Sequence, residues 1–162
     1  MTTRIVEYLA DIACAGSLLG LRSGASVADI DRAIGDPGYV DDIDKRRKHF
    51  RRDYGLIEFV FKRDPVANWA CFSAKVAVHR LRWNTHIPRS ILPEIGEAPP
   101  VVPLGCLTES IIGRGRSIRK MDTEFRDFEY YSISSSPAQV IATAEDIDDI
   151  LVANSVWSIA LW

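Results

Sequence analysis

The sequence predicts an α+β fold in which short helices pack on one face of an antiparallel sheet. Three observations lead to this class. Apolar residues recur at helical spacing near the start of the chain, they alternate along short segments further on, and turn-forming residues separate these segments. The predicted order is helix, helix, strand, strand, proline-rich segment, helix, strand, strand, strand, which places the helices on one side of the sheet.

Two helices are predicted before residue 36. Residues 3–14 carry an apolar stripe opposite Glu7 and Asp11, which is typical of an amphipathic helix. The second helix follows Ser26, a capping residue, with Asp29 at the position that completes a capping box, and it ends at Gly35. Because it is only about two to three turns long, packing must stabilise it.

The sequence pattern in the middle of the chain predicts strands. Residues 39–53 contain little apolar surface and are interpreted as an exposed loop or a polar strand pair. Residues 56–61 alternate, and their aromatic side is expected to face the core. A second strand is predicted from residue 69 to residue 81, with one face made of Phe72, Ala74, Val76 and Val78.

The second half of the chain begins after a proline-rich stretch. Residues 84–103 are predicted to be a linker, because proline cannot donate to a strand ladder and disfavours helix in the residue before it. A short helix is then expected at 104–112, with strands at 125–133, 138–144 and 156–161 and an acidic turn at 146–151. We therefore expect a single domain, residues 1–162, with structural halves 1–83 and 104–162 that could be degenerate helix-plus-meander repeats.

The amino-acid composition is that of a globular protein. The chain has 162 residues, of which 47% are apolar and 26% charged, which suits one globular domain. Its apolar runs are shorter than the roughly 20 residues of a membrane helix, and acidic residues near the start argue against a secretory signal. We therefore expect a cytoplasmic protein that does not enter a membrane.

The cysteines and histidines do not predict a metal or cofactor site. The three cysteines are widely separated, so they match neither a disulfide framework nor a metal knuckle. The three histidines have no spacing typical of metal ligands. No local signature of an activated nucleophile or of a phosphate loop is present either, so no catalytic residue is predicted.

The charge is distributed unevenly along the chain. The formal net charge is −2, but residues 1–120 hold 19 Lys and Arg against 14 Asp and Glu, a net of +5, while residues 121–162 hold 1 against 8, a net of −7. Such polarity bears on partners and on encounter rates rather than on the fold.

The acidic end of the chain, residues 121–162, is the first candidate binding site. Its carboxylates are interspersed with aromatic residues, which suits a protein interface in which aromatic anchors supply affinity and charge attracts a basic partner. An ordinary solvated face over buried aromatics fits the same pattern. The candidate partner-binding residues are Asp122, Glu124, Asp127, Glu129, Tyr130, Tyr131, Glu145, Asp146, Asp148 and Asp149.

A basic segment is the second candidate site. Clustered cations can bind a phosphate backbone, but neighbouring carboxylates could equally neutralise them in a solvated loop. Because the chain is slightly acidic overall and no recognition helix is predicted, nucleic acid is the less favoured partner. The residues of this patch are Lys45, Arg46, Arg47, Lys48, Arg51 and Arg52.

One stretch of about forty residues resembles known bacterial modules. It runs Leu21-Arg-Ser-Gly-Ala-Ser-Val-Ala-Asp-Ile, then Ile34-Gly-Asp-Pro, then Tyr54-Gly-Leu-Ile-Glu-Phe. This pattern is similar to the helix and strand repeats of the beta-lactamase inhibitory protein and small protein A type, and to immunity-like proteins found beside secreted toxins. The resemblance implies a non-enzymatic module that binds another protein through its sheet face.

Three functions are therefore considered. The leading hypothesis is a protein-binding module, in particular an immunity protein that occludes a toxin with a basic surface. The first alternative is a nucleic-acid-associated regulator that uses residues 45–52. The second is a small-molecule enzyme whose site the sequence does not reveal.

Overall fold

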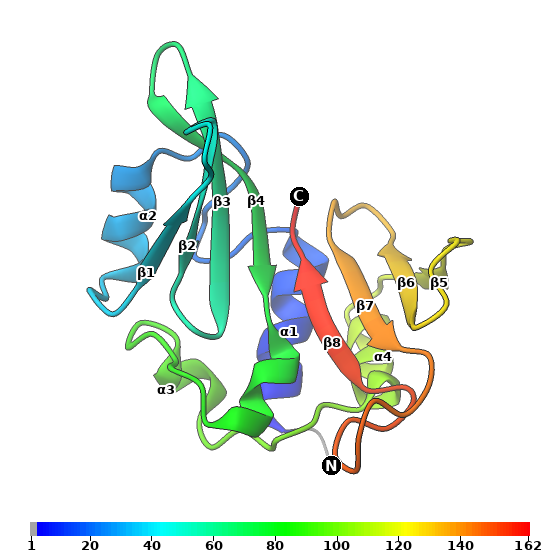
Figure 1. Ribbon diagram of the computed structural model, residues 1–162. Coiled ribbons are helices and arrows are strands. Elements are labelled where there is room, and N and C mark those ends of the chain that lie inside the picture. Colours follow the sequence, from blue (N-terminus) through cyan, green and yellow to red (C-terminus); the bar gives the residue numbers. More distant parts are fainter. Residues whose placement is uncertain (1–2) are drawn as a thin grey trace.

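The computed structural model describes residues 3–162 and confirms the α+β class (Figure 1). In this part of the chain, one antiparallel sheet of eight strands has the order β1-β2-β3-β4-β8-β7-β6-β5. The strands are β1 (Val40–Ile43), β2 (His49–Asp53), β3 (Ile57–Asp64), β4 (Asn68–Val76), β5 (Ile118–Lys120), β6 (Phe128–Ile133), β7 (Gln139–Thr143) and β8 (Val156–Ala160). The helices are α1 (Arg4–Ala15), α2 (Val27–Ile34), α3 (Leu92–Ile95), α4 (Leu104–Gly113) and the 3₁₀ helix η1 (Val78–Trp83).

The sheet consists of two four-stranded meanders that meet at their last strands. β4 and β8 are antiparallel neighbours, with Lys75 opposite Ala160 and Val76 opposite Ile159. Each meander follows two α-helices, α1 and α2 in one case and α3 and α4 in the other. The two halves of the chain thus share an element order, in which two α-helices precede a four-stranded meander.

One hydrophobic core joins the two halves. α1 packs against α3 and α4, and Figure 1 shows α1 and α4 behind the middle of the sheet. The buried cluster includes Leu9 of α1, Phe59 of β3, Leu107 of α4 and Ile159 of β8. The opposite face of the sheet is called the open face below.

The first two helices form as the sequence predicts. In the capping box, Ser26 Oγ accepts a hydrogen bond from the backbone N–H of Asp29, and Asp29 Oδ2 accepts one from the backbone N–H of Ser26, both at 3.1 Å. Gly35 follows α2 with φ +60°, a left-handed conformation that glycine adopts readily. Ile30 and Ile34 are fully buried.

The strand expected at 69–81 is only partly right. β4 ends at Val76, and Val78 belongs to η1, because the chain turns there to cross the end of the sheet. A β-bulge opposite the Val60/Phe61 pair also changes the expected face. Cys71 and Ala74 are buried, whereas Phe72 is 37% exposed. Phe72 therefore does not share the core side with Ala74 and Val76.

Other elements differ in extent. Residues 39–53 form the polar strand pair β1 and β2 rather than a loop, and β5 is a strand that the pattern did not predict. The strand expected at 125–133 begins at Phe128. Residues 84–103 include α3, and Ile91, Ile95 and Val102 of this segment are buried in the core.

Candidate functional site

The open face of the sheet carries two different kinds of surface. Along β3, Ile57, Phe59 and Phe61 are buried in the core as expected, so Glu58 and Val60 point to the open face. Along β6, Tyr131 packs against the core, so Phe128 and Tyr130 point to the open face. The open face is therefore charged on the β2–β4 side and aromatic on the β6–β8 side.

Aromatic rings from three elements are in contact on the open face. His79 of η1 stacks on Trp157 of β8 with ring centroids 3.9 Å apart and an interplanar angle of 3°. The ring centroids of Trp157 and Phe128 are 4.9 Å apart, and those of His79 and Trp83 are 6.0 Å apart. Trp83 remains 61% exposed, which leaves a large apolar ring available for contact.

A second pair of rings extends this row. Phe125 lies 5.5 Å from Tyr130, and Phe125 is 67% exposed. A β-bulge places Trp157 in the row, since Ile141 is opposite Ser158 while Ala142 is opposite Val156. Trp157 is thus the extra residue of its strand, and its ring leaves the regular alternation.

The sequence-predicted acidic residues lie mainly in two neighbouring loops. Residues 121–127 connect β5 to β6, and residues 144–155 connect β7 to β8. The loops lie side by side, because the backbone N–H of Ala144 donates to the carbonyl of Asp127 at 3.0 Å. Among the ion pairs of residues 3–162, six of these carboxylates take no part: Asp122, Glu124, Asp127, Glu145, Asp146 and Asp149.

The other predicted acidic-end residues have local partners. Asp148 forms an ion pair with Arg82 and accepts backbone hydrogen bonds from Ile150 at 2.9 Å and Leu151 at 2.7 Å. Glu129 binds Lys120 at 2.6 Å and accepts a hydrogen bond from the Tyr131 hydroxyl at 2.5 Å. The hydrogen bond from Lys120, followed by that from Tyr131, lowers the pKa of Glu129.

Tyr130 and Tyr131, adjacent in the sequence, are separated by the alternation of β6. Tyr131 packs on the core side, where burial and the bonded Glu129 raise its pKa to about 12. Tyr130 joins the aromatic row instead. We define the acidic-aromatic surface by what is exposed or half-exposed around the two loops: Trp83, Asp122, Glu124, Phe125, Asp127, Phe128, Tyr130, Glu145, Asp146, Asp149 and Trp157.

η1 holds this surface together. The carbonyl of Trp157 accepts a hydrogen bond from His79 Nδ1 at 3.0 Å, which requires the proton on Nδ1. Burial lowers the pKa of His79, and the charge of Arg80 acts in the same direction, so the ring is neutral at pH 7. The Arg82 guanidinium lies 4.0 Å from the centre of the Trp83 ring while it pairs with Asp148.

The predicted basic patch divides into two groups. Arg52 is buried, with Asp41 at 2.8 Å and Asp31 at 2.5 Å, and Arg51 pairs with Glu58 at 3.2 Å. The remaining four cations form the turn between β1 and β2. Lys62 and Arg63 of β3 lie beside them, since the backbone N–H of Arg63 donates to the carbonyl of Lys48 at 3.1 Å.

These six exposed cations form the basic tip: Lys45, Arg46, Arg47, Lys48, Lys62 and Arg63. None of them takes part in the ion pairs of the described residues 3–162. Lys62 lies 5.9 Å from the Phe72 ring, and His49 contacts the same ring at 5.7 Å. The tip thus combines positive charge with an accessible aromatic side chain.

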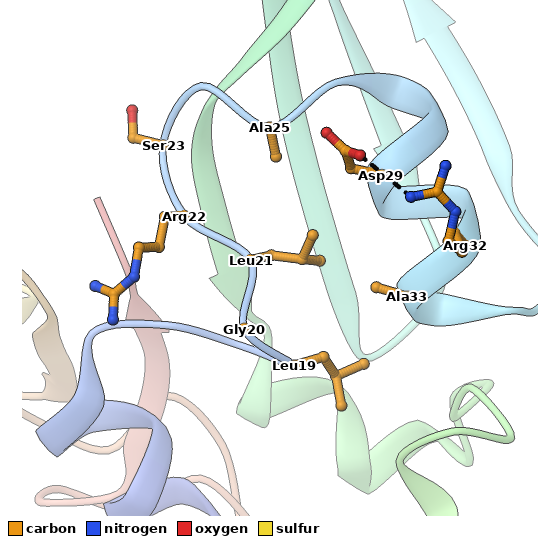
Figure 2. Close-up of a pocket in the computed structure, with 9 residues that line it drawn as sticks. All are labelled: Leu19, Gly20, Leu21, Arg22, Ser23, Ala25, Asp29, Arg32 and Ala33. Carbon is orange, nitrogen blue, oxygen red and sulfur yellow. Dashed lines mark ion pairs between the residues drawn. The ribbon is translucent and has the colours of Figure 1, made fainter.

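An open pocket of about 430 Å³ lies between α2 and the loop that precedes it (Figure 2). Its apolar wall includes Leu21 and Ala33. Asp29 is already used by the capping box and lies 3.6 Å from Arg32. Figure 2 shows the Arg22 side chain on the other side of the loop from Asp29 and Arg32, so these charged groups do not converge on one ligand position.

An Asp–His pair, Asp36 with His86, lies just after α2. Asp36 accepts hydrogen bonds from the backbone N–H groups of Gly38 and Arg89 and lies 3.0 Å from His86 Nε2. Among residues 3–162, no hydrogen bond joins a serine, threonine or cysteine side chain to a histidine. In the same range, no three His, Cys, Asp or Glu side chains are grouped so that they could hold a metal ion.

The helices of the described part of the chain include none that is both long and apolar enough to cross a membrane. Comparisons with family models, with curated proteins and with solved structures found no match to this chain.

Sequence reasoning missed Trp83 and Trp157, two members of the acidic-aromatic surface, and also His79, whose ring contacts both of them. Trp83 and Trp157 lie far apart in the chain and approach each other only because η1 packs against β8. The sequence predicts no role for His79 as a metal ligand, and in the structure its ring stacks on Trp157. The four tryptophans of this chain are a signal of large apolar rings, but whether such rings are exposed depends on the fold.

Proposed function

We propose that this chain is a non-enzymatic protein-binding module of the bacterial cytoplasm, and that it is an immunity protein that neutralises a toxin by occluding it. The acidic-aromatic surface contacts the partner, and the partner presents a basic surface. The observation that carries the proposal is the gathering of exposed and half-exposed aromatic rings on the open face, bordered by six carboxylates that form no ion pair with residues 3–162.

The chemistry of this surface suits a protein partner. Trp and Tyr are enriched among the residues that dominate interface energies, because they bury much area at low entropic cost. Unpaired carboxylates around them attract a basic partner and accelerate its encounter. The acidic-aromatic surface offers both features, with Trp83 and Phe125 as the most exposed anchors.

Contacts that order the acidic-aromatic surface within one chain also support a role in protein binding. The hydrogen bond from His79 to Trp157 connects η1 to β8, and the ion pair between Arg82 and Asp148 connects η1 to the loop of residues 144–155. A surface that is ordered before binding loses less conformational entropy when the partner arrives. The resemblance of residues 21–61 to inhibitory and immunity-like modules, which bind through a sheet face, agrees with this location.

The test is binding to the protein encoded beside this gene, measured by pull-down and by calorimetry. Combined Trp83→Ala and Phe125→Ala substitution should weaken binding by about tenfold or more, because both anchors are lost. Protection of cells that express the neighbouring protein should be lost in parallel.

A matched control truncates an exposed apolar side chain elsewhere. Ile112→Ala changes α4, on the other side of the molecule from the open face, and Ile112 is similarly exposed. This variant should bind like the wild type. Absence of binding by the wild-type chain, or equal binding by the double variant and the control, would contradict the proposal.

A further inference from the structure

The basic tip and the acidic-aromatic surface lie at opposite corners of the same sheet. β4 starts next to the tip, at Asn68, and runs away from it to Val76. β8 is antiparallel to β4 and pairs with its far end, so the loop of residues 144–155, which precedes β8, lies at the end away from the tip. Figure 1 shows the β3–β4 turn and this loop at opposite ends of the molecule.

The two corners also belong to different meanders. The tip is formed by β1, β2 and β3, whereas the acidic loops connect β5 to β6 and β7 to β8. The line between the corners therefore crosses the sheet diagonally. A two-fold axis that runs parallel to the plane of the sheet, above its open face and perpendicular to this diagonal, places each corner of one copy over the opposite corner of the other.

We propose that a second copy of this chain binds the open face about such an axis, and that the basic tip of each copy contacts the acidic loops of the other. Both contacts are equivalent, so the assembly closes as a dimer instead of growing into a filament. The dimer goes beyond the proposed function and does not depend on the identity of any other partner, but it uses the same acidic loops, so a second copy and the proposed partner exclude each other there.

Charge complementarity is the main argument for this occupant. Each corner carries an excess of one sign: six exposed cations beside Asp44 at the tip, and six exposed carboxylates beside Arg126 in the loops, and these cations and carboxylates form no ion pairs among residues 3–162. In the proposed orientation both contacts bring opposite signs together. The opposite orientation would place tip on tip and loop on loop, which is repulsive.

Aromatic side chains accompany the charges at both corners. Phe72 is exposed beside Lys62 at the tip, and Trp83 is exposed beside the loops. Guanidinium and ammonium groups bind the faces of aromatic rings, and Arg82 already lies on Trp83 within one chain. A cation from the tip of a second copy can use the same kind of contact with exposed Phe125.

The proposal predicts a salt-sensitive dimer. Sedimentation velocity of the purified wild-type chain over a range of micromolar concentrations should show a monomer–dimer equilibrium at low ionic strength. The dimer fraction should fall several-fold between about 0.05 M and 0.5 M salt, since screening lengths shorten from above 10 Å to a few ångström.

Two charge-reversed variants make the test specific. The tip variant carries Lys45→Glu, Arg46→Glu and Lys48→Glu, and the loop variant carries Glu124→Lys, Glu145→Lys and Asp149→Lys. All six side chains are exposed and take no part in the ion pairs of the described chain. Each variant alone should be monomeric, because both of its contacts become repulsive.

Mixing the variants should restore the dimer. The reversed tip of one then meets the reversed loops of the other, while the second contact is native. Far-UV circular dichroism and melting temperature of each variant check that both remain folded. Recovery of the dimer in the mixture is an outcome that two misfolded variants would not give.

Several results would overturn the proposal. One is a monomer at all concentrations in low salt, and another is a dimer that neither reversal affects. A third is a mixture that stays monomeric. A labelled single-stranded oligonucleotide that binds the monomeric wild type but not the tip variant would assign the tip to phosphate groups instead. Binding to the neighbouring gene's product is measured separately, so failure of one proposal leaves the other standing.

Discussion

Glu58 is a buried carboxylate on the open face of the sheet. Its oxygens lie 2.7 Å from Lys75 Nζ, 2.5 Å from Arg80 Nη2 and 3.2 Å from Arg51 Nη1. Burial raises the pKa of Glu58, but the hydrogen bond from Lys75 and the surrounding positive charges outweigh it and lower the pKa overall. The carboxylate is thus ionised at neutral pH and forms ion pairs with three cations at once.

Replacing this carboxylate tests its contribution. Glu58→Gln should lower the free energy of unfolding at pH 7 by about 3 kcal/mol, because three cations lose their shared partner. Chemical denaturation measures the change. Lys62→Gln is a matched control on the same strand, outside any ion pair of residues 3–162, and should change stability by no more than about 0.5 kcal/mol.

The effect of Glu58→Gln should depend on pH. Since folding lowers the pKa of Glu58 from its ordinary value of 4.5, its stabilisation is fully present above that value and is lost as pH falls through the folded-state pKa. The difference between wild type and variant should therefore shrink below pH 4.5. Equal stability at pH 7, or a difference that grows in acid, would contradict this account.

At the scale of elements, the stability of a short helix depends on the capping of its ends and on its contacts with other elements. α2 has eight residues, which is too few for an isolated helix to be stable in water. Its capping box satisfies N-terminal backbone groups, and Asp31 accepts hydrogen bonds from Arg52 at 2.5 Å and from the Tyr54 hydroxyl at 3.0 Å. These ties attach α2 to β2 and to the chain that follows it.

The capping box gives an element-scale prediction. Ser26→Ala should lower the free energy of unfolding by about 1 kcal/mol, because the backbone N–H of Asp29 loses its acceptor. Thermal and chemical denaturation measure this change. Ser23→Ala, in the exposed loop before α2, is the control and should behave like the wild type. If both variants lose the same stability, the cap is not the cause.

Two β-bulges determine which aromatic side chains reach the surface. One lies in β4 and exposes Phe72, and the other lies in β8 and brings Trp157 into the aromatic row. A bulge shifts the alternation of a strand by one residue, so every side-chain assignment beyond it changes face. Strand alternation in the sequence carries no mark of either bulge.

The molecule as a whole is held by contacts between its two halves. Arg114 of the segment after α4 pairs with Glu7 and Asp11 of α1, each at 2.7 Å. β4 pairs with β8, and Leu107 and Ile111 of α4 lie in the same buried cluster as Leu9. The first helix therefore depends on residues from the far half of the chain.

A fragment experiment tests this dependence. Residues 1–83 expressed alone should not unfold cooperatively, because α1 and β4 lose the partners that bury them. Circular dichroism during denaturation and dispersion of amide resonances measure this property. A sharp unfolding transition of the fragment would show instead that the first half folds independently.

The sequence by itself determined the class of the fold and most of its elements. Helical spacing, Ser26 and Gly35 located α1 and α2, and alternation located β3 with its buried aromatic side. These features depend on residues that are only a few positions apart in the sequence. Periodicity and helix capping are patterns over the same short distance, so the sequence reveals them. The excess of carboxylates after residue 120 was visible for the same reason.

Only the tertiary structure decided how the charged and aromatic residues are grouped. It buried Arg52 and left Lys45 exposed, because Arg52 lies between Asp31 and Asp41 of other elements. Through the packing of η1 on β8, it also brought Trp83 and Trp157 into contact with the same ring, that of His79. Exposure and contact between distant residues follow from strand order, register and bulges, which no short stretch of sequence specifies.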